Sequence, residues 1–462
     1  MGIKTTSLEP WIKRKISGDS SGENSGVLTR KQIEDYQLGK LQETLEWVSS
    51  NSRFYQRLYS GLDCKISTLQ DVSKLPFTTS EDVKEDPLDF LCVSQNDINR
   101  IVTLQSSGTT GKPKRLFFTE ADQELTIDFF HHGMLTLVKP GDRVLILLPG
   151  EIRGSVGDLL RLGLERAGVT GIVHGLVTNP ELTLEQIKRE NINGLVGIPT
   201  QVLSLARFKD SKGSSPSLTI KSVLLSTDYV PLAIVKELKE LWGCQVFNHY
   251  GMTEMGLGGG LECEGFCGYH LREADLYIEI IDPSSGLPVT DGQLGEIVLT
   301  TLTRSAMPLI RYRTGDLSRF ISGPCACHTV LKRLELIKSR DRVYLTQTAY
   351  LSMADFDEVL FDLDKVLNFE VTLTEGGSEK ESHLHLAVQL KDSVSLETER
   401  RVLQAVDKIP VVLAARQNGS LKVFLNFVSS PEIISRKGPA KRQIRDKRGS
   451  VKSVGRARGQ TG

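Results

Sequence analysis

The chain has 462 residues, of which 39% are hydrophobic and 25% are charged, and its 57 Lys and Arg residues balance 57 Asp and Glu residues. That length exceeds one ordinary hydrophobic core, so we expect two or three domains. No apolar run reaches the roughly 18 residues that cross a bilayer, and the polar start lacks the apolar core of a secretory signal, so no membrane span is expected.

The N-terminal segment is polar. Residues 1–27 include the run Ser-Gly-Asp-Ser-Ser-Gly at 17–22 and predict a flexible lead. Apolar residues then recur at spacings of three and four, which predicts an amphipathic helix over 28–50: Leu38, Leu41, Leu45 and Val48. Helix-capping residues follow within 75–82.

A glycine-rich stretch at 106–114 reads Ser-Ser-Gly-Thr-Thr-Gly-Lys-Pro-Lys. Its glycines permit close backbone approach, and its hydroxyl and amide groups can surround an anion that the lysines neutralise, so it predicts a polyphosphate-binding loop. It differs from the P-loop because only two residues separate Gly108 from Gly111, and Pro113 follows Lys112. A polar surface turn is the alternative interpretation.

The middle of the chain alternates short apolar runs with helical spacing. The runs of strand length lie at 144–148, 195–198, 223–225 and 246–247, and a helix is predicted at 231–242. This alternation predicts an α/β fold with a parallel sheet covered by helices and with ligands at the strand ends. The run Tyr-Gly-Met-Thr-Glu at 250–254 follows one of these strands directly, where such a ligand would bind.

The pattern changes to β-hairpins after residue 275. Antiparallel strands are predicted at 276–281 and 296–301, with a turn at 283–286, and they lead into Tyr-Arg-Thr-Gly-Asp at 312–316. Beyond about residue 337 the elements predict a compact α+β domain of about a hundred residues. Its helices are expected at 355–363 and 397–406, and its strands at 384–390 and 421–428.

The C-terminal segment is basic. Residues 436–462 contain ten Lys or Arg residues and one acid, Asp446. Because this segment has no aromatic residue on which bases could stack, we expect no nucleic-acid partner. Residues 449–462 predict a disordered, solvated tail.

The chain has seven cysteines, an odd number that indicates reduced thiols and a cytoplasmic protein rather than a disulfide framework. Four of them form two close pairs near histidines, and thiolate and imidazole groups are ligands that zinc takes in closed tetrahedral sites. We therefore predict a structural metal held by Cys263, His270, Cys325 and Cys327, with Cys267 and His328 as reserve ligands. Ordinary reduced thiols are the alternative interpretation.

The three motifs at 106–114, 250–254 and 312–316 stand in the order found in the adenylate-forming enzymes, which include acyl-CoA synthetases, luciferases and peptide-synthetase adenylation domains. Within that superfamily the chain resembles the phenylacetate:CoA ligase type through 75–79, 280–286, 299–303 and 307–316. The resemblance covers roughly residues 28–448. It implies a large adenylation domain of layered sheets and helices with a hairpin-rich part at 28–337, and a small mobile α+β lid at 338–448.

The resemblance implies a two-step reaction. A carboxylic acid, aromatic by default, attacks the α-phosphorus of ATP with Mg²⁺, and CoA then displaces AMP from the acyl-adenylate. Transfer to a carrier protein or another acceptor is one alternative. A nucleotide-binding regulatory protein that has lost turnover is another. Enzymes of this type often pair, so a homodimer is one implied assembly.

Site residues follow by motif position. The resemblance implies that Thr109, Thr110, Lys112 and Lys114 of this chain hold the phosphates of ATP. It also implies that Glu254 ligates magnesium and that Asp316 binds the ribose hydroxyls. Taken alone, Glu254 could cap a helix and Asp316 a turn. The full implied ATP site is Ser106, Ser107, Gly108, Thr109, Thr110, Gly111, Lys112, Lys114, Ser226, Thr227, Asp228, Tyr250, Gly251, Met252, Thr253, Glu254, Asp316 and Arg340.

A catalytic lysine is also implied near the C-terminus. The related enzymes place it after a glycine, where this chain has Pro439. Lys437 and Lys441 lie two positions away on either side, and we favour Lys441 because Arg442 continues the related sequence. At the hinge between the domains the register is open between Arg340 and Asp341.

Overall fold

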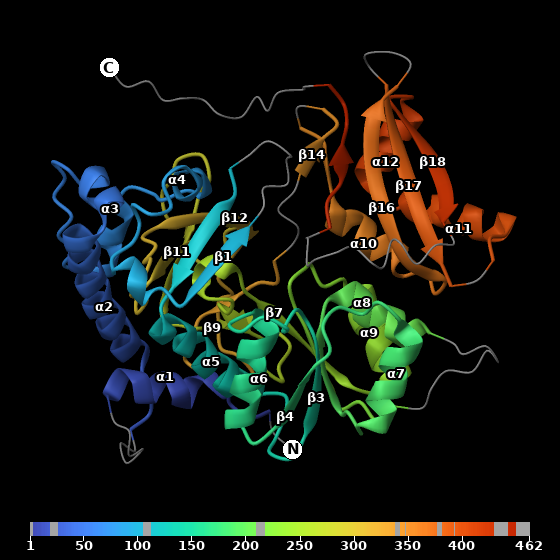
Figure 1. Ribbon diagram of the computed structural model, residues 1–462. Helices are drawn as coiled ribbons and strands as arrows, with labels where there is room; N and C mark the ends of the chain where they lie inside the picture. Colours follow the sequence, from blue (N-terminus) through green and yellow to red (C-terminus); the bar gives the residue numbers. More distant parts are fainter. Residues whose placement is uncertain are drawn as a thin grey trace.

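An eight-stranded sheet forms the centre of the computed structural model (Figure 1), in the order β13-β9-β8-β7-β6-β5-β3-β4. The structure describes residues 3–18, 26–104, 112–208, 218–337, 342–346, 348–376, 381–391, 393–428 and 442–449. The predicted parallel sheet is confirmed, with β4 as a fifth strand that was not foreseen. The five neighbouring parallel strands are β3 (Arg143–Leu147), β4 (Thr170–Val173), β5 (Gly194–Gly197), β6 (Ser222–Leu225) and β7 (Gln245–Tyr250). Three short antiparallel strands extend this sheet: β8 (Gly260–Leu261), β9 (Tyr269–Leu271) and β13 (Arg333–Leu334).

Helices cover both faces of the central sheet (Figure 1). Along β3, Leu145 and Leu147 join one buried cluster while Val144 and Ile146 join another, because successive strand residues point to opposite faces. One face packs against α5 (Glu120–Met134) and α6 (Val156–Arg166); the other packs against α7 (Pro180–Arg189), α8 (Pro199–Arg207) and α9 (Leu232–Trp242). Burial on both faces explains the continuous apolar runs in these strands.

A second, antiparallel sheet confirms the predicted hairpins. It consists of β10 (Leu276–Ile281), β11 (Gly295–Thr301) and β12 (Tyr312–Ser318). A separate hairpin, β1 (Arg100–Leu104) and β2 (Lys114–Phe118), flanks the glycine-rich stretch. The helix predicted at 28–50 is α2 (Arg30–Asn51), which begins at a capping box on Thr29. Its apolar residues share a cluster with the second sheet, and α3 (Arg53–Leu58) and α4 (Ser80–Glu85) follow it.

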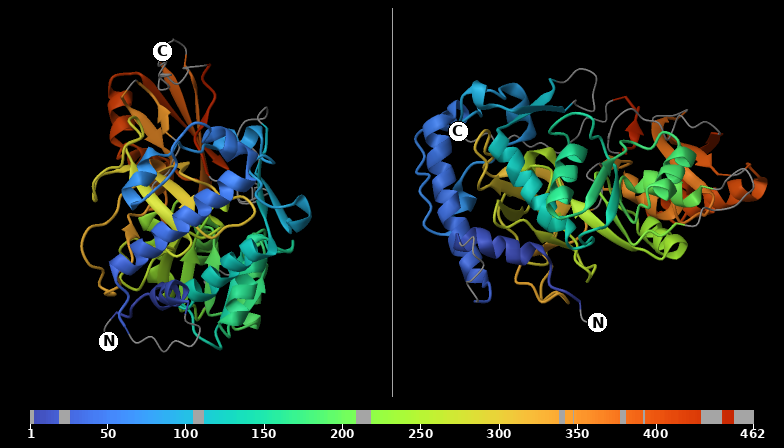
Figure 2. Two further views of the ribbon diagram at one scale, coloured as in Figure 1. Left: turned by 90° about the vertical axis from the view of Figure 1, so that its left-hand side faces the viewer. Right: turned by 60° about the horizontal axis from the view of Figure 1, so that its bottom comes forward.

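The described residues between 342 and 449 form what we call the C-terminal unit, at the opposite end of the molecule from α2 (Figures 1 and 2). Its sheet has the order β18-β17-β16-β19. The strands are β14 (Arg342–Tyr344), β15 (Tyr350–Ser352), β16 (Val366–Glu375), β17 (Ser382–Leu390), β18 (Leu421–Val428) and β19 (Arg445–Asp446), and the helices are α10 (Met353–Leu360), α11 (Leu396–Val406) and α12 (Pro410–Gln417). The predicted α+β composition is confirmed, although β16 and α12 were not foreseen.

The C-terminal unit packs against α8 and α9 through a buried charge. Arg207 has a side chain only 1% exposed and forms an ion pair with Glu237 on α9. Its guanidinium also donates to the backbone oxygens of Phe361, at 2.7 Å, and Val366. Apolar residues of β16, α10 and α8 share one buried cluster around these contacts.

The interpretation of residues 1–27 as a flexible lead is wrong for α1 (Leu8–Ser17). This helix buries Leu8, Trp11 and Ile12, and the indole nitrogen of Trp11 donates to Asp128 on α5 at 2.7 Å. The spacing of the three apolar residues is helical, but the segment is short and polar elsewhere, so its helix depends on packing against α5. Among the described helices, none has both the length and the apolar composition needed to cross a membrane.

Candidate active site

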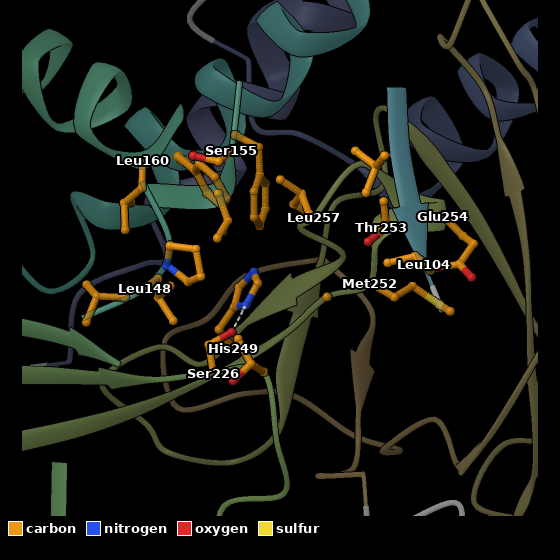
Figure 3. A pocket seen from close by; sticks show the side chains of 18 of the residues that line it. Leu104, Leu148, Ser155, Leu160, Ser226, His249, Met252, Thr253, Glu254 and Leu257 are labelled. Carbon is orange, nitrogen blue, oxygen red and sulfur yellow. Dashed lines mark hydrogen bonds between the residues drawn. The ribbon is translucent and has the colours of Figure 1, made fainter. Parts of the chain in front are cut away.

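A cavity of about 700 Å³ opens at the carboxyl ends of the parallel strands, where the sequence predicted a ligand (Figure 3). Leu148 follows β3, Ser226 follows β6, and His249 lies near the end of β7. One part of the lining is apolar. It comes from α5, α6, the parallel strands and the segment from 257 to β8: Phe129, Phe130, Met134, Leu148, Leu160, Val196, Leu224, Leu257 and Leu261. Such a lining favours an apolar ligand group.

His249 is an ionisable side chain that lies beside this apolar part of the lining (Figure 3). Its Nδ1 lies 2.8 Å from the hydroxyl oxygen of Ser226. Its Nε2 is buried and has no hydrogen-bond partner among the described residues. Burial lowers the pKa of His249 to about 4, so the ring is neutral near pH 7. A neutral imidazole held through Nδ1 offers one hydrogen bond to a ligand through Nε2.

Glu254 lies at the polar end of the cavity, on a short 3₁₀ turn at Thr253–Met255. Its carboxylate forms an ion pair with Lys114, and both side chains are largely buried. The hydroxyl of Tyr312 donates to Glu254 Oε1 at 3.1 Å and accepts from Lys114 Nζ at 3.1 Å. Arg304 holds the turn by donating to the backbone oxygen of Glu254 at 2.9 Å. A cation and a carboxylate thus lie side by side where phosphate and metal contacts were predicted.

Asp316 is a buried residue of β12, 1% exposed. Its carboxylate Oδ2 accepts a hydrogen bond of 2.9 Å from the hydroxyl of Tyr250 at the end of β7. Two motifs 66 residues apart in sequence are therefore in direct contact. This contact fixes Asp316 against the strand whose end lines the cavity.

The loop after β6 has an unusual backbone. Thr227 lines the cavity with φ of 74°, a conformation that is rare for a β-branched residue. Strain of this kind costs about 1–3 kcal/mol and persists where surrounding contacts impose it, commonly at functional sites. After the neighbouring strand β7, Gly251 also lines the cavity, and glycine is required there because a Cβ would lie 2.0 Å from the backbone oxygen of Leu257. Both residues were predicted to contact ATP.

The C-terminal unit reaches the same cavity. Gln443 lines it, and the backbone N–H of Arg442 donates to Asp228 Oδ2 at 3.2 Å. The guanidinium of Arg442 pairs with Asp357 on α10 and donates to the backbone oxygen of Phe369 at 3.1 Å. These contacts hold Arg442 and Gln443 beside the loop that follows β6.

The structure brings together many of the predicted site residues. Those that line the cavity are Lys114, Ser226, Thr227, Gly251, Met252, Thr253 and Glu254. Tyr250 and Asp316 pair beside them, Asp228 contacts Arg442, and Lys112 is exposed outside the lining. Ser106, Ser107, Gly108, Thr109, Thr110, Gly111, Arg340 and Lys441 lie outside the described residues. The four predicted metal ligands gather outside the cavity lining.

Sequence reasoning assigned no specific chemistry to His249 and no role to Tyr312 or Gln443. His249 directly precedes a motif at a predicted strand end, and Tyr312 is the first residue of another motif, so position alone could have drawn attention to both. No local sequence pattern indicates whether the side chain of His249 or Tyr312 lies near the cavity, because the position of each depends on how β12 and β2 pack against β7.

Three comparisons relate this chain to known proteins. The model of the AMP-binding enzyme family matches residues 61–303. Phenylacetate-coenzyme A ligase of Thermus thermophilus is 29% identical over 377 residues, which cover 78% of this chain and 83% of that protein. The protein of the same name from Escherichia coli is 28% identical over 320 residues, covering 67% and 71%. A structure of 2-hydroxyisobutyryl-CoA ligase in the postadenylation state, in complex with 2-HIB-AMP, is similar with a TM-score of 0.76 and 20% sequence identity. The match covers 91% of this chain and 90% of that protein chain, and it shows similarity of fold alone.

Proposed function

The chain belongs to the AMP-binding enzyme family, and from this premise we propose that it activates an apolar carboxylic acid with ATP and transfers the acyl group to CoA. The observation that carries the proposal is one cavity with an apolar part around His249 and a polar end at Lys114 and Glu254. An apolar acid and a charged polyphosphate need these two environments next to each other. The phenylacetate-coenzyme A ligase relatives favour an aromatic acid.

In the first step a carboxylate oxygen of the substrate attacks the α-phosphorus of ATP, and pyrophosphate leaves. Positioning and charge neutralisation contribute most to such a transfer. Lys114 supplies positive charge at the polar end, Asp316 would accept hydrogen bonds from the ribose, and Ser226 to Asp228 would face the base. In the second step the CoA sulfur attacks the acyl carbon and AMP leaves. The same cavity then holds the acyl group, and the apolar walls exclude water from the adenylate.

A magnesium ion fits the chemistry of this end of the cavity. Hard divalent cations take oxygen ligands, and Glu254 offers a buried carboxylate that already lies beside a cation, Lys114. Glu254 would hold the ion, which would supply positive charge to the phosphates of ATP. The homodimer, the cytoplasmic location and the mobility of the C-terminal unit stay predictions.

A panel of carboxylic acids tests the function. We expect ATP–pyrophosphate exchange to depend on the added acid, with aromatic and other apolar acids well above acetate, because only the former fill the apolar part of the cavity. Thioester formation should follow when CoA is present. Exchange without a thioester product would indicate a different acceptor. Absence of exchange with every acid would contradict catalysis and favour a regulatory nucleotide-binding protein.

His249 should set a preference for acids that carry a hydrogen-bonding group. In His249→Leu we expect kcat/KM for such acids to fall at least about tenfold, with plain hydrocarbon acids little changed, because a matched buried hydrogen bond contributes about 1–3 kcal/mol. His383→Leu, in the sheet of the C-terminal unit, is the control. Equal losses for both classes of acid would show that His249 only supports the fold.

The pH dependence gives an independent check on His249. Since burial lowers its pKa to about 4, from an ordinary value of 6.5, the ring stays neutral and the preference should be constant between about pH 6 and pH 8. Because the pKa of His249 is lower in the folded than in the unfolded protein, its contribution to the free energy of unfolding is complete above about pH 6.5. This contribution is lost as the pH falls through about 4. The preference is measured as the ratio of kcat/KM for paired acids at several pH values.

A further inference from the structure

Three thiols and an imidazole converge outside the cavity. The ligand atoms of Cys263, His270, Cys325 and Cys327 all lie within 4.8 Å of one another. All four residues are buried, at 1%, 0%, 4% and 0% exposure respectively. They come from three places in the chain: the residues after β8, the strand β9, and the segment between β12 and β13. None of them lines the cavity described above.

The distances within the cluster match those around a tetrahedral metal. Zinc–sulfur bonds of about 2.3 Å and zinc–nitrogen bonds of about 2.1 Å imply S···S separations of roughly 3.8 Å and S···N separations of roughly 3.6 Å. Here the sulfur atoms of Cys263 and Cys325 are 3.6 Å apart, and the sulfur of Cys327 lies 3.4 Å from Nε2 of His270. A disulfide would need about 2.05 Å between sulfurs, and the cysteines are free.

Backbone groups support thiolates at this position. The N–H of Gly265 donates to the sulfur of Cys263 at 3.3 Å, and the backbone of Thr329 is hydrogen-bonded to Cys327. Donated N–H groups stabilise an anionic sulfur. Gly265 also leaves room, since a Cβ there would lie 3.3 Å and 3.4 Å from the sulfurs of Cys263 and Cys325.

We propose that Cys263, His270, Cys325 and Cys327 bind one structural Zn²⁺. Four protein ligands close a tetrahedral site and leave no open position for a substrate, so the role is structural. The reserve ligands Cys267 and His328 are exposed and are not needed. Both ligand loops contain non-glycine residues with positive φ, Phe266 at 47° and His328 at 59°, and a bound metal would offset the cost of holding them.

The position of this zinc suggests what it stabilises. Next to Cys263, Glu262 accepts hydrogen bonds from the backbone N–H of Asn248 at 2.9 Å and from its side chain at 2.6 Å. Asn248 directly precedes His249. On the other side, Thr329 and Val330 follow Cys327 and donate to Glu9 on α1. The metal would therefore connect the β8–β9 loop to the segment between β12 and β13, which contacts α1. Through Glu262 and Asn248 it would also stabilise β7, the strand that contains His249.

Metal analysis of the purified full-length protein tests the proposal. We expect about one equivalent of zinc. Prolonged chelation should lower the thermal unfolding midpoint by about 5 °C or more, because a ligand that binds only the folded state adds its binding free energy to stability. Cobalt added to the metal-depleted protein should show the visible absorption of a tetrahedral thiolate site.

Matched cysteine variants locate the site. Cys325→Ser should lose most of the zinc and the cobalt spectrum, whereas Cys267→Ser, four residues after Cys263 but exposed, should keep both. If Cys325→Ser does not fold, the metal content of the wild type and of Cys267→Ser still decides the question. Less than about a tenth of an equivalent of zinc in protein made with zinc in the medium, with no destabilisation by chelator, would overturn the proposal in favour of ordinary thiols.

Discussion

Glu254→Gln and Asp316→Ala are each expected to abolish most of the acid-dependent ATP–pyrophosphate exchange. Glu254 is the buried carboxylate beside Lys114, and a neutral amide of the same shape keeps the packing but loses the charge that would hold magnesium. Asp316 is held by Tyr250 and would bind the ribose, so its loss misplaces ATP. We expect losses on the order of a hundredfold or more.

Folding must be measured together with exchange. Glu254→Gln leaves Lys114, whose side chain is 12% exposed, without its carboxylate, and an uncompensated, largely buried charge destabilises a protein. Circular dichroism and thermal unfolding show whether each variant is folded at the assay temperature. Asp291→Ala, an exposed carboxylate in a turn, is the control and should behave as wild type. Exchange at the wild-type rate in both site variants would refute the assignment of the ATP site.

The second large effect is expected at Lys441. A lysine near the α-phosphate acts where charge builds up in the transition state, so Lys441→Ala should slow adenylation about a hundredfold or more, or roughly 2.7 kcal/mol. Lys441 lies outside the described residues, but its neighbours support the choice: Arg442 donates to Asp228 and Gln443 lines the cavity.

Separate assays of the two steps distinguish a catalytic lysine from a general loss of structure. Thioester formation from supplied acyl-adenylate should remain nearly intact in Lys441→Ala, because the lysine acts on the first step. Lys437→Ala is the matched comparison, and the double variant tests whether one lysine replaces the other. Normal adenylation in all three variants would mean that both lysines belong to the solvated basic segment.

Local patterns predicted the elements whose burial is regular. Strands buried on both faces produce continuous apolar runs, so β3, β5, β6 and β7 could be recognised without any knowledge of their partners. The helix α1 could not, because its few apolar side chains are buried by elements distant in sequence, such as α5, more than a hundred residues later. The ion pair of Lys114 with Glu254, and the contacts of Tyr312 with both, also depend on how β2 and β12 approach the turn after β7.

The cluster of Cys263, His270, Cys325 and Cys327 shows a different limit of prediction from sequence. Residue types alone suggested the four side chains that the structure brings together, since soft donors in two close groups are uncommon. Their spacing could not establish the geometry, because Cys327 meets His270 only when β13 pairs with β9. The sequence also could not show that Cys267 is exposed while Cys263 is buried, since both lie on the same connection.

The packing of the C-terminal unit on α8 and α9 has a consequence for the order of synthesis. Arg207 and the apolar residues around it emerge from the ribosome well before Phe361 and Val366, which cover them in the folded protein. Until then the nascent chain presents an uncovered apolar face with an arginine at its edge, the kind of surface on which incomplete chains associate. Chaperone binding during translation should therefore centre on α8 and α9 and end once β16 has been released.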